Sequence, residues 1–152
     1  MFKKEMTLLP DVLKKKQLPK IETFPCPISS EAGKNSVVKI IFPEFTCVCP
    51  KTGYPDFASI DLYYLPTTKC IELKSWKLYL NSFRMIGTFH ETVTDHLFTT
   101  VNTLIMPKWL LIVGDFFPRG NVDTTIAIEC GKRPSSADFV LQKYASHCRN
   151  FN

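Results

Sequence analysis

Residues 37–65 read VVKIIFPEFTCVCPKTGYPDFASIDLYYL, and the expected fold is built around this segment. A run rich in β-branched residues extends from Val37 to Phe42, and an alternating apolar pattern runs from Phe57 to Leu65. Both patterns predict β-strands. Proline and glycine residues between the two runs disfavour helix and strand. We therefore expect a β-hairpin with a long connecting loop, a place where functional residues often lie.

The loop holds a cysteine and an aspartate seven positions apart, Cys49 and Asp56, in the sequence CPKTGYPD. A tight turn with this spacing brings a sulfur and a carboxylate to one point, as a nucleophile and its acid require. The competing interpretation is that Cys49 fills the core, because cysteine is among the most buried residue types. The loop alone leaves both interpretations open.

Length and composition predict one globular domain with a basic N-terminal arm. A chain of 152 residues is close to the usual size of a single core, and 45% of its residues are hydrophobic. Residues 1–20 hold six lysines against Glu5 and Asp11, a balance of +4, so the other 132 residues carry only +1. No aromatic residues interleave with Lys14 to Lys16, so nucleic acid is not an expected partner. We expect residues 1–35 to be a solvated arm lying on a single domain of residues 36–152.

Cysteine usage predicts a reduced, cytoplasmic protein. We expect no signal peptide, and the apolar content suffices for folding without disulfides. The C-V-C spacing at residues 47–49 is not that of a zinc knuckle, and Cys70 and His90 add no known ligand spacing, so no metal is expected. The longest apolar run, Trp109 to Val113, is too short to span a bilayer. The six cysteines are Cys26, Cys47, Cys49, Cys70, Cys130 and Cys148.

Two amphipathic helices are predicted after the hairpin. From Glu72 to Arg84 apolar residues recur every three to four positions, and this helix should end at Gly87. Thr88 should begin the second helix, which Met106-Pro107 closes. The first helix should bury Trp76, Tyr79, Leu80 and Phe83, and the second should bury Phe89, Val93, Leu97, Val101 and Leu104 or Ile105.

Two further strands follow the helices, from Trp109 to Phe117 and from Val122 to Ile128. A turn at Pro118-Arg119-Gly120 separates them. The predicted order is ββααββ, in an α+β fold.

Four polar residues of the helical region have simple structural explanations. Lys74 and Lys77 fit a solvated helix face. Thr88 and Glu91 fit a capping box, in which the threonine caps the helix and the glutamate reaches back to the N–H of the cap. A functional role for any of them depends on the combination of motifs.

That combination resembles a known family. Residues 72–84, ELKSWKLYLNSFR, resemble the signature of the NADPH-dependent nitrile reductases of queuosine biosynthesis, the QueF family, in its short single-module form. Residues 45–57 resemble the nucleophile loop of these enzymes, and residues 89–91, FHE, resemble their substrate-binding tripeptide. With the turn at 118–120, the blocks cover roughly residues 42–120 in the order of the family. The two departures are Leu73, where many members have serine, and Asn121, where many have a second glycine.

The resemblance implies the tunnelling fold (T-fold) shared with GTP cyclohydrolase I. In that fold the sheets of several subunits join into a barrel, which removes exposed sheet edges. Two stacked rings of five subunits, a homo-decamer, are expected, with the sites between subunits.

The resemblance also implies a reaction. The nitrile of 7-cyano-7-deazaguanine is reduced to the primary amine of 7-aminomethyl-7-deazaguanine, an oxidoreductase step in tRNA modification. Cys49 adds to the nitrile and forms a thioimide, while Asp56 supplies a proton. Two NADPH are consumed per turnover, and no metal is required.

The site residues implied by the resemblance fall into two groups. Glu91 should accept adjacent N–H groups of the guanine-like edge in a bidentate way. The chain has no G-x-G-x-x-G motif, so cations rather than a Rossmann loop should hold the phosphates of the dinucleotide. The expected substrate contacts are Ile71, Glu72, Leu73, His90 and Glu91. The expected NADPH contacts are Lys74, Lys77 and Arg119.

Two alternative functions are weighed against the reductase. An amidinotransferase relative shares the cysteine and aspartate loop and the thioimide but lacks the reductase signature, so the intact residues 72–79 argue against it. A nucleobase- or tRNA-binding module would use the lysine-rich arm and leave Cys49 inert. Oxidation of NADPH on addition of the nitrile separates the three.

Overall fold

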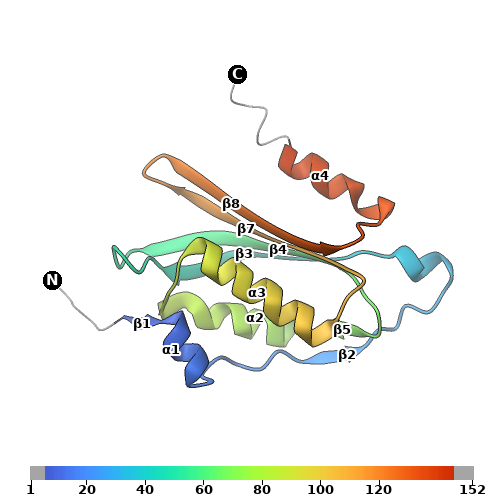
Figure 1. The fold of residues 1–152 in the computed structure, drawn as a ribbon, viewed down its shortest axis with the longest axis horizontal. Coiled ribbons are helices and arrows are strands. Elements are labelled where there is room, and N and C mark those ends of the chain that lie inside the picture. The colour runs from blue at the N-terminus through green and yellow to red at the C-terminus, as the bar shows by residue number, and fades with distance from the viewer. Residues whose placement is uncertain (1–5, 146–152) are drawn as a thin grey trace.

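The structure, a computed structural model, describes residues 6–145 and has a six-stranded sheet at its centre. The strands follow the order β1-β6-β3-β4-β7-β8, with α1, α2 and α3 on one face of the sheet and α4 on the other (Figure 1). The helices and strands are β1 (Thr7–Leu8), α1 (Leu9–Lys14), β2 (Thr23–Pro25), β3 (Val38–Val48), β4 (Pro55–Leu65), β5 (Lys69–Ile71), α2 (Leu73–Asn81), β6 (Ile86–Gly87), α3 (His90–Ile105), β7 (Trp109–Arg119), β8 (Val122–Gly131) and α4 (Asp138–Ala145).

The predicted ββααββ order is confirmed by β3, β4, α2, α3, β7 and β8, and the fold is α+β. All three pairings, β3 with β4, β4 with β7 and β7 with β8, are antiparallel. β3 extends six residues beyond the predicted end at Phe42. The β-branched run ends there, before Pro43. In the structure the strand continues past this proline with a shift in its pairing register on β4 between Phe42 and Phe45. The connecting loop is therefore shorter than expected.

The main core lies between the sheet and the helices. Every residue predicted to be buried by the first helix is buried, although Phe83 lies in the 3₁₀ turn that follows α2. On α3 the predicted stripe is confirmed except at its start. Phe89 is 47% exposed because the helix begins at His90 and Phe89 has extended backbone. The buried apolar residues of α3 are Val93, Leu97, Val101 and Ile105.

The prediction that Gly87 ends the first helix is wrong. α2 ends at Asn81, continues as a 3₁₀ turn over Ser82–Met85, and leads into β6. Gly87 lies in β6, where it is paired with Leu8 and Val48. A Cβ at this position would collide with Met6, so the glycine permits close strand approach rather than a left-handed helix cap.

Residues 6–35 pack on the rest of the chain and contribute to its core. β1 pairs with β6 and β2 pairs with β5. Leu9, Val12 and Ile21 belong to the main buried cluster, so the core does not begin at Ser36 as the sequence pattern indicated.

The opposite face of the sheet has a second, smaller core that the sequence did not predict. Ala137, just before α4, and Val140, within α4, pack against a buried cluster on the central strands. The strand members of this cluster are Tyr63, Leu65, Trp109, Leu111 and Val113. Within residues 6–145, no helix is long and apolar enough to cross a membrane.

Both edges of the sheet expose long strands. In the described part of the chain, the outer side of β3 is paired only at Val48, and β8 has no partner on its outer side. Unpaired N–H and C=O groups along such edges readily pair with another chain.

Candidate active site

Two neighbouring strands bring polar side chains together at one end of the sheet. Cys47 on β3 lies opposite Asp56 on β4, and the flanking pair is Phe45 with Ala58. Side chains alternate along a strand, so Cys47 and Asp56 face the helices as Phe45 and Ala58 do. Cys49 lies two residues beyond Cys47 and is also buried, with 8% of its surface exposed.

A β-bulge directs Arg119 to the same place. The register of β7 on β8 shifts between Phe116 and Arg119, so β7 carries one residue more than β8 in this interval. In a regular strand, residues three apart point to opposite faces, but the extra residue returns Arg119 to the face of Phe116. Its NH1 group donates a hydrogen bond to Oδ1 of Asp56 at 2.5 Å.

The turn after Arg119 accommodates the departure from the family pattern at Asn121. Gly120 and Asn121 have φ values of 61° and 65° and form the two-residue loop between β7 and β8. Two left-handed residues are the requirement of a type I′ hairpin turn, and asparagine tolerates this conformation better than most residues. Asn121 therefore keeps the shape that a second glycine would allow.

His90, the first residue of α3, binds the other oxygen of Asp56. Its ring stacks on Phe116, with centroids 3.7 Å apart and planes 7° from parallel. Nε2 of His90 then lies 3.2 Å from Oδ2 of Asp56, whose side chain is only 6% exposed. A buried carboxylate needs such partners because leaving water costs several kcal/mol unless the charge is compensated.

The Cys49 loop is tight, as predicted. The N–H of Cys49 donates to the carbonyl of Tyr54, and the N–H of Gly53 donates to the carbonyl of Cys49. Burial raises the pKa of the Cys49 thiol, but hydrogen bonds from Arg119 and Thr52 and from the backbone at Thr52 and Lys51 outweigh it. The resulting pKa is about 7, against an ordinary 9.0, so much of Cys49 is thiolate at neutral pH.

The neighbouring Cys47 has the opposite character. Burial raises its pKa to about 12, and the nearby negative charges of Asp56 and Cys49 contribute to the rise. Cys47 therefore remains a neutral thiol under conditions in which Cys49 ionises. Two cysteines only two residues apart thus have pKa values shifted in opposite directions.

The capping-box explanation for Glu91 is wrong. The N-terminal cap of α3 is Phe89, and no side chain caps it. The N–H of Thr88 donates to the carbonyl of Val48, so it is not available to Glu91. Glu91 is exposed and has no hydrogen-bond or ion-pair partner among residues 6–145. A free carboxylate thus stands next to His90.

The first predicted substrate segment lies elsewhere in the chain. Glu72 caps α2, accepting hydrogen bonds from the N–H groups of Lys74 at 2.9 Å and Ser75 at 2.6 Å. These bonds, that of Ser75 first, lower the pKa of Glu72. Ile71 is buried, and its N–H donates a hydrogen bond to the hydroxyl of Tyr64. Leu73 is exposed.

The predicted site residues near Cys49 and those of residues 71–77 lie at opposite ends of α3 (Figure 1). Thr67, just before β5, donates a hydrogen bond to the carbonyl of Met106 at the C-terminal end of α3. His90 is at the other end of this helix, which is about 24 Å long at 1.5 Å per residue. One chain therefore brings together Cys49, Asp56, His90, Glu91 and Arg119. It does not bring Ile71, Glu72, Leu73, Lys74 or Lys77 to them.

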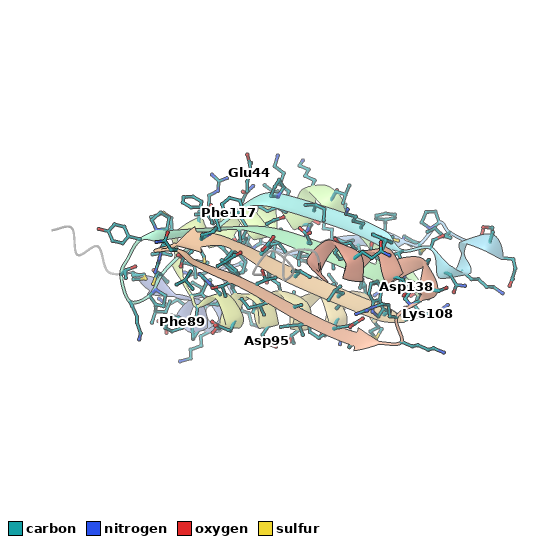
Figure 2. All side chains as sticks on the ribbon, turned by 90° about the horizontal axis from the view of Figure 1, so that it is seen from above. Glu44, Phe89, Asp95, Lys108, Phe117 and Asp138 are labelled. Atoms are coloured by element: carbon teal, nitrogen blue, oxygen red, sulfur yellow. The ribbon has the colours of Figure 1, made fainter. Side chains whose placement is uncertain are left out.

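Exposed aromatic residues flank the Cys49 end of the molecule. Figure 2 shows Phe89 and Phe117 towards one end, away from Lys108 and Asp138. Phe89 is 47% exposed and Phe117 is 57% exposed. Large exposed apolar side chains in one region often mark a surface that contacts a ligand or another subunit.

Among residues 6–145, no group of three or more His, Cys, Asp or Glu side chains could hold a metal ion.

Three contacts of the site were missed by sequence reasoning. Thr52 donates to the Cys49 sulfur, Phe116 supports the His90 ring, and Arg119 binds Asp56. Thr52 lies in the loop with Cys49, which is a signal that local sequence does contain. The other two contacts depend on strand register and on a bulge, which sequence periodicity does not reveal.

The fold and the site define an α+β protein in which a cysteine of lowered pKa lies near a buried carboxylate. The model of the family described as QueF-like protein matches residues 55–135. The chain is 47% identical over 115 residues to the NADPH-dependent 7-cyano-7-deazaguanine reductase of Anaeromyxobacter sp. (strain K), covering 76% of this chain and 92% of that protein. Identity is 44% over 108 residues with the protein of that name from Aquifex aeolicus, covering 71% and 81%. The chain belongs to the QueF family.

A solved structure shares the fold. The crystal structure of the archaeosine synthase QueF-Like in the apo form superposes with a TM-score of 0.60 over 65% of this chain and 97% of that chain. Sequence identity is 20%, so this likeness concerns the fold alone.

Glu72 and Glu91 provide a matched pair for testing the helix starts. Glu72→Ala removes two hydrogen bonds to backbone N–H groups and should lower the melting temperature by roughly 2–4 °C, the usual effect of losing a cap in a chain of this size. Glu91→Ala should leave it unchanged because Glu91 caps nothing. Thermal unfolding at one protein concentration measures both. A loss of stability in Glu91→Ala as large as in Glu72→Ala would support the capping-box interpretation of Glu91.

Proposed function

We propose that this chain is an NADPH-dependent reductase that converts the nitrile of 7-cyano-7-deazaguanine to the amine of 7-aminomethyl-7-deazaguanine for queuosine biosynthesis. The observation that carries the proposal is the low-pKa thiol of Cys49 beside Asp56 in a member of the QueF family. Relatives that bear the name of this activity match most of their own length.

The first step is addition of sulfur to the nitrile. A nitrile carbon is a poor hydride acceptor, and attack by the Cys49 thiolate forms an S–C bond and leaves a C=N bond in a covalent thioimide. The nitrile nitrogen becomes negative as the bond forms and takes up a proton. We assign the transfer to Asp56, whose carboxylate takes up a proton from His90 on its second oxygen and relays it to the nitrile nitrogen.

Reduction then requires two hydrides. When bound, NADPH supplies one hydride to the thioimide and a second to the imine that remains after sulfur leaves. The nitrile gains four electrons and four protons in total, so two NADPH and two further protons are consumed for each amine. Release of the sulfur returns Cys49 to its starting state.

Recognition of the heterocycle is assigned to Glu91 and His90. The guanine-like edge presents adjacent N–H donors, which a carboxylate accepts in a bidentate way. Glu91 suits this role because its carboxylate is exposed and makes no other contact within residues 6–145. His90 is fixed by Phe116 and Asp56, so it offers a rigid edge between the nucleophile and the base.

The second half of the site belongs to a neighbouring subunit in this proposal. Ile71, Glu72 and Leu73 lie about a helix length from His90 within one chain, too far to contact the same heterocycle. The open edges of β3 and β8 support the T-fold arrangement, in which sheets of adjacent subunits pair into a barrel. A homo-decamer of two stacked rings would place these three residues of one subunit next to Cys49 of another.

NADPH phosphates are assigned to Lys74 and Lys77. Both side chains are exposed on α2, three residues apart and therefore on one face of the helix. They lie at the same end of the helical layer as Glu72, so they would reach the nucleophile of a neighbour together with that segment. Arg119 is 47% exposed and keeps donors free for a phosphate, although its NH1 group is bound to Asp56.

The proposed function is tested by NADPH oxidation on addition of 7-cyano-7-deazaguanine. Absorbance at the NADPH band should fall by two equivalents per nitrile consumed, and Cys49→Ala should abolish the reaction. Cys130→Ala is the matched control because Cys130 is a half-buried thiol on β8. Without NADPH oxidation, a covalent adduct would indicate the amidinotransferase, and the absence of both would indicate a binding module.

The cofactor assignment is tested with Lys74→Ala and Lys77→Ala. Loss of a charge-assisted phosphate contact should raise the KM for NADPH roughly tenfold to hundredfold and leave thioimide formation intact, since that step needs no cofactor. Lys34→Ala, which removes a lysine paired with Glu31, is the control. A normal KM for NADPH in both variants would indicate that these lysines only form a solvated helix face.

Mixed oligomers locate the lysines relative to the nucleophile. A chain with Cys49→Ala and a chain with both lysine substitutions should each be nearly inactive alone at an NADPH concentration well below the raised KM. If the lysines act on the Cys49 of a neighbour, co-expressed oligomers contain some sites with both parts intact and regain activity. Mixed oligomers no more active than the two parents would place lysines and nucleophile in the same chain.

A further inference from the structure

We propose that Arg119 is part of the nucleophilic apparatus, where its guanidinium stabilises the Cys49 thiolate and ties it to Asp56. The resemblance to the family assigns this residue to the phosphates of NADPH instead. The inference deepens the proposed function, because it concerns the group that attacks the nitrile, but its test requires neither nitrile nor NADPH.

The position of Arg119 is built into the sheet. The bulge in β7 turns the side chain to the helix-facing side, and the type I′ turn at Gly120 and Asn121 follows at once. NH1 lies 2.5 Å from Oδ1 of Asp56. The guanidinium is thereby held beside Cys49, where its hydrogen bond lowers the pKa of the thiol. A residue needed only to attract a distant phosphate would not require this fixed geometry.

The charges around the Cys49 sulfur identify Arg119 as the decisive cation. Asp56 approaches from β4, Cys47 from β3, and Lys51 belongs to the loop itself, where its backbone N–H rather than its ammonium contacts the sulfur. His90, from α3, contacts Asp56. Among these groups, Arg119 is the cation whose side chain is hydrogen-bonded to the sulfur.

The same contact is visible from the side of the arginine. The pKa of Arg119 is raised first by its hydrogen bond to Cys49 and further by the charges of Asp56 and Cys49. Arginine suits this position because its planar fork can bind a carboxylate and a second acceptor at once. A lysine ammonium offers a compact charge without that fixed fork.

The pH profile of Cys49 alkylation tests the inference. Iodoacetamide is reacted with the native protein between about pH 5.5 and about pH 10.5, and fragment mass spectrometry separates Cys49 from Cys47. The midpoint should be about 7 in the wild type and should move towards 9.0 in Arg119→Met. Cys47, whose pKa is about 12, serves as an unreactive thiol in the same peptide.

The rates give a second signature because thiolates of lower pKa are intrinsically less nucleophilic. With a midpoint moved by two units, the thiolate fraction at pH 7 falls roughly fiftyfold while the intrinsic reactivity rises roughly eightfold. Arg119→Met should therefore react roughly sixfold more slowly at pH 7 and roughly eightfold faster at about pH 10.5. A merely looser loop would raise the rate at every pH and produce no such crossing.

Two variants serve as controls. Arg133→Met removes an arginine that is paired with Glu129 near the other end of the β7–β8 hairpin, and it should leave the profile unchanged. Arg119→Lys keeps the charge without the fork and should give an intermediate midpoint, which also carries the test if Arg119→Met does not fold.

A midpoint near 9 in the wild type, or an unchanged midpoint in folded Arg119→Met or Arg119→Lys, overturns the inference. An unchanged profile together with a raised KM for NADPH would make Arg119 a phosphate ligand. The alkylation result stands even if no nitrile is reduced, so failure of this inference and failure of the proposed function are distinguishable.

Discussion

The buried carboxylate of Asp56 is the constraint around which the site is organised. A carboxylate with 6% exposure must be compensated, and its two oxygens are bound separately by Arg119 and His90. Arg119 reaches it only because β7 contains a bulge, and His90 reaches it only because α3 begins at that residue with its ring on Phe116. One buried charge thus fixes the end of β7, the start of α3 and the surroundings of the Cys49 sulfur.

This arrangement separates two tasks between different parts of the chain. In the proposed function, the end of the sheet prepares the thiolate, while the start of α2 carries the backbone and lysines assigned to substrate and cofactor. The length of α3 keeps the two parts of one chain apart. In the proposed assembly, neighbouring chains join through the sides of β3 and β8 that are left open within residues 6–145. In this account, assembly brings a complete nucleophile of one subunit to a complete binding segment of the next. Assembly and activity are therefore expected to be coupled.

Local sequence predicts the parts of this protein that depend on periodicity. Alternation from Phe57 to Leu65 and the three-to-four spacing on the helices predicted β4, α2 and α3 and most of the residues that each contributes to the main core. Errors arose where tertiary contacts override local rules. Gly87 serves strand packing rather than a helix end, and the N–H that a capping box would use at Thr88 is taken by β3.

The residue types of the candidate site could be proposed from the sequence, whereas their geometry could not. The loop spacing made Cys49 and Asp56 candidates, and the resemblance to the family supplied the other residues. The contact of Arg119 with both of them follows from a one-residue bulge, for which the turn sequence gives no signal. The helix α4 was missed because the strands already pack one face against the helices of the main core, and nothing in the sequence pattern indicated that the second face is covered as well.

The central claim is that Cys49 is a nucleophile prepared to add to a nitrile, and the mass of the intact chain tests it most directly. The protein is mixed with 7-cyano-7-deazaguanine without NADPH and then denatured. Addition of a thiol to a nitrile loses no atoms, so the account predicts a gain equal to the full mass of one nitrile per chain, located on Cys49. An unchanged mass at saturating nitrile, or an adduct on Cys47, would contradict it.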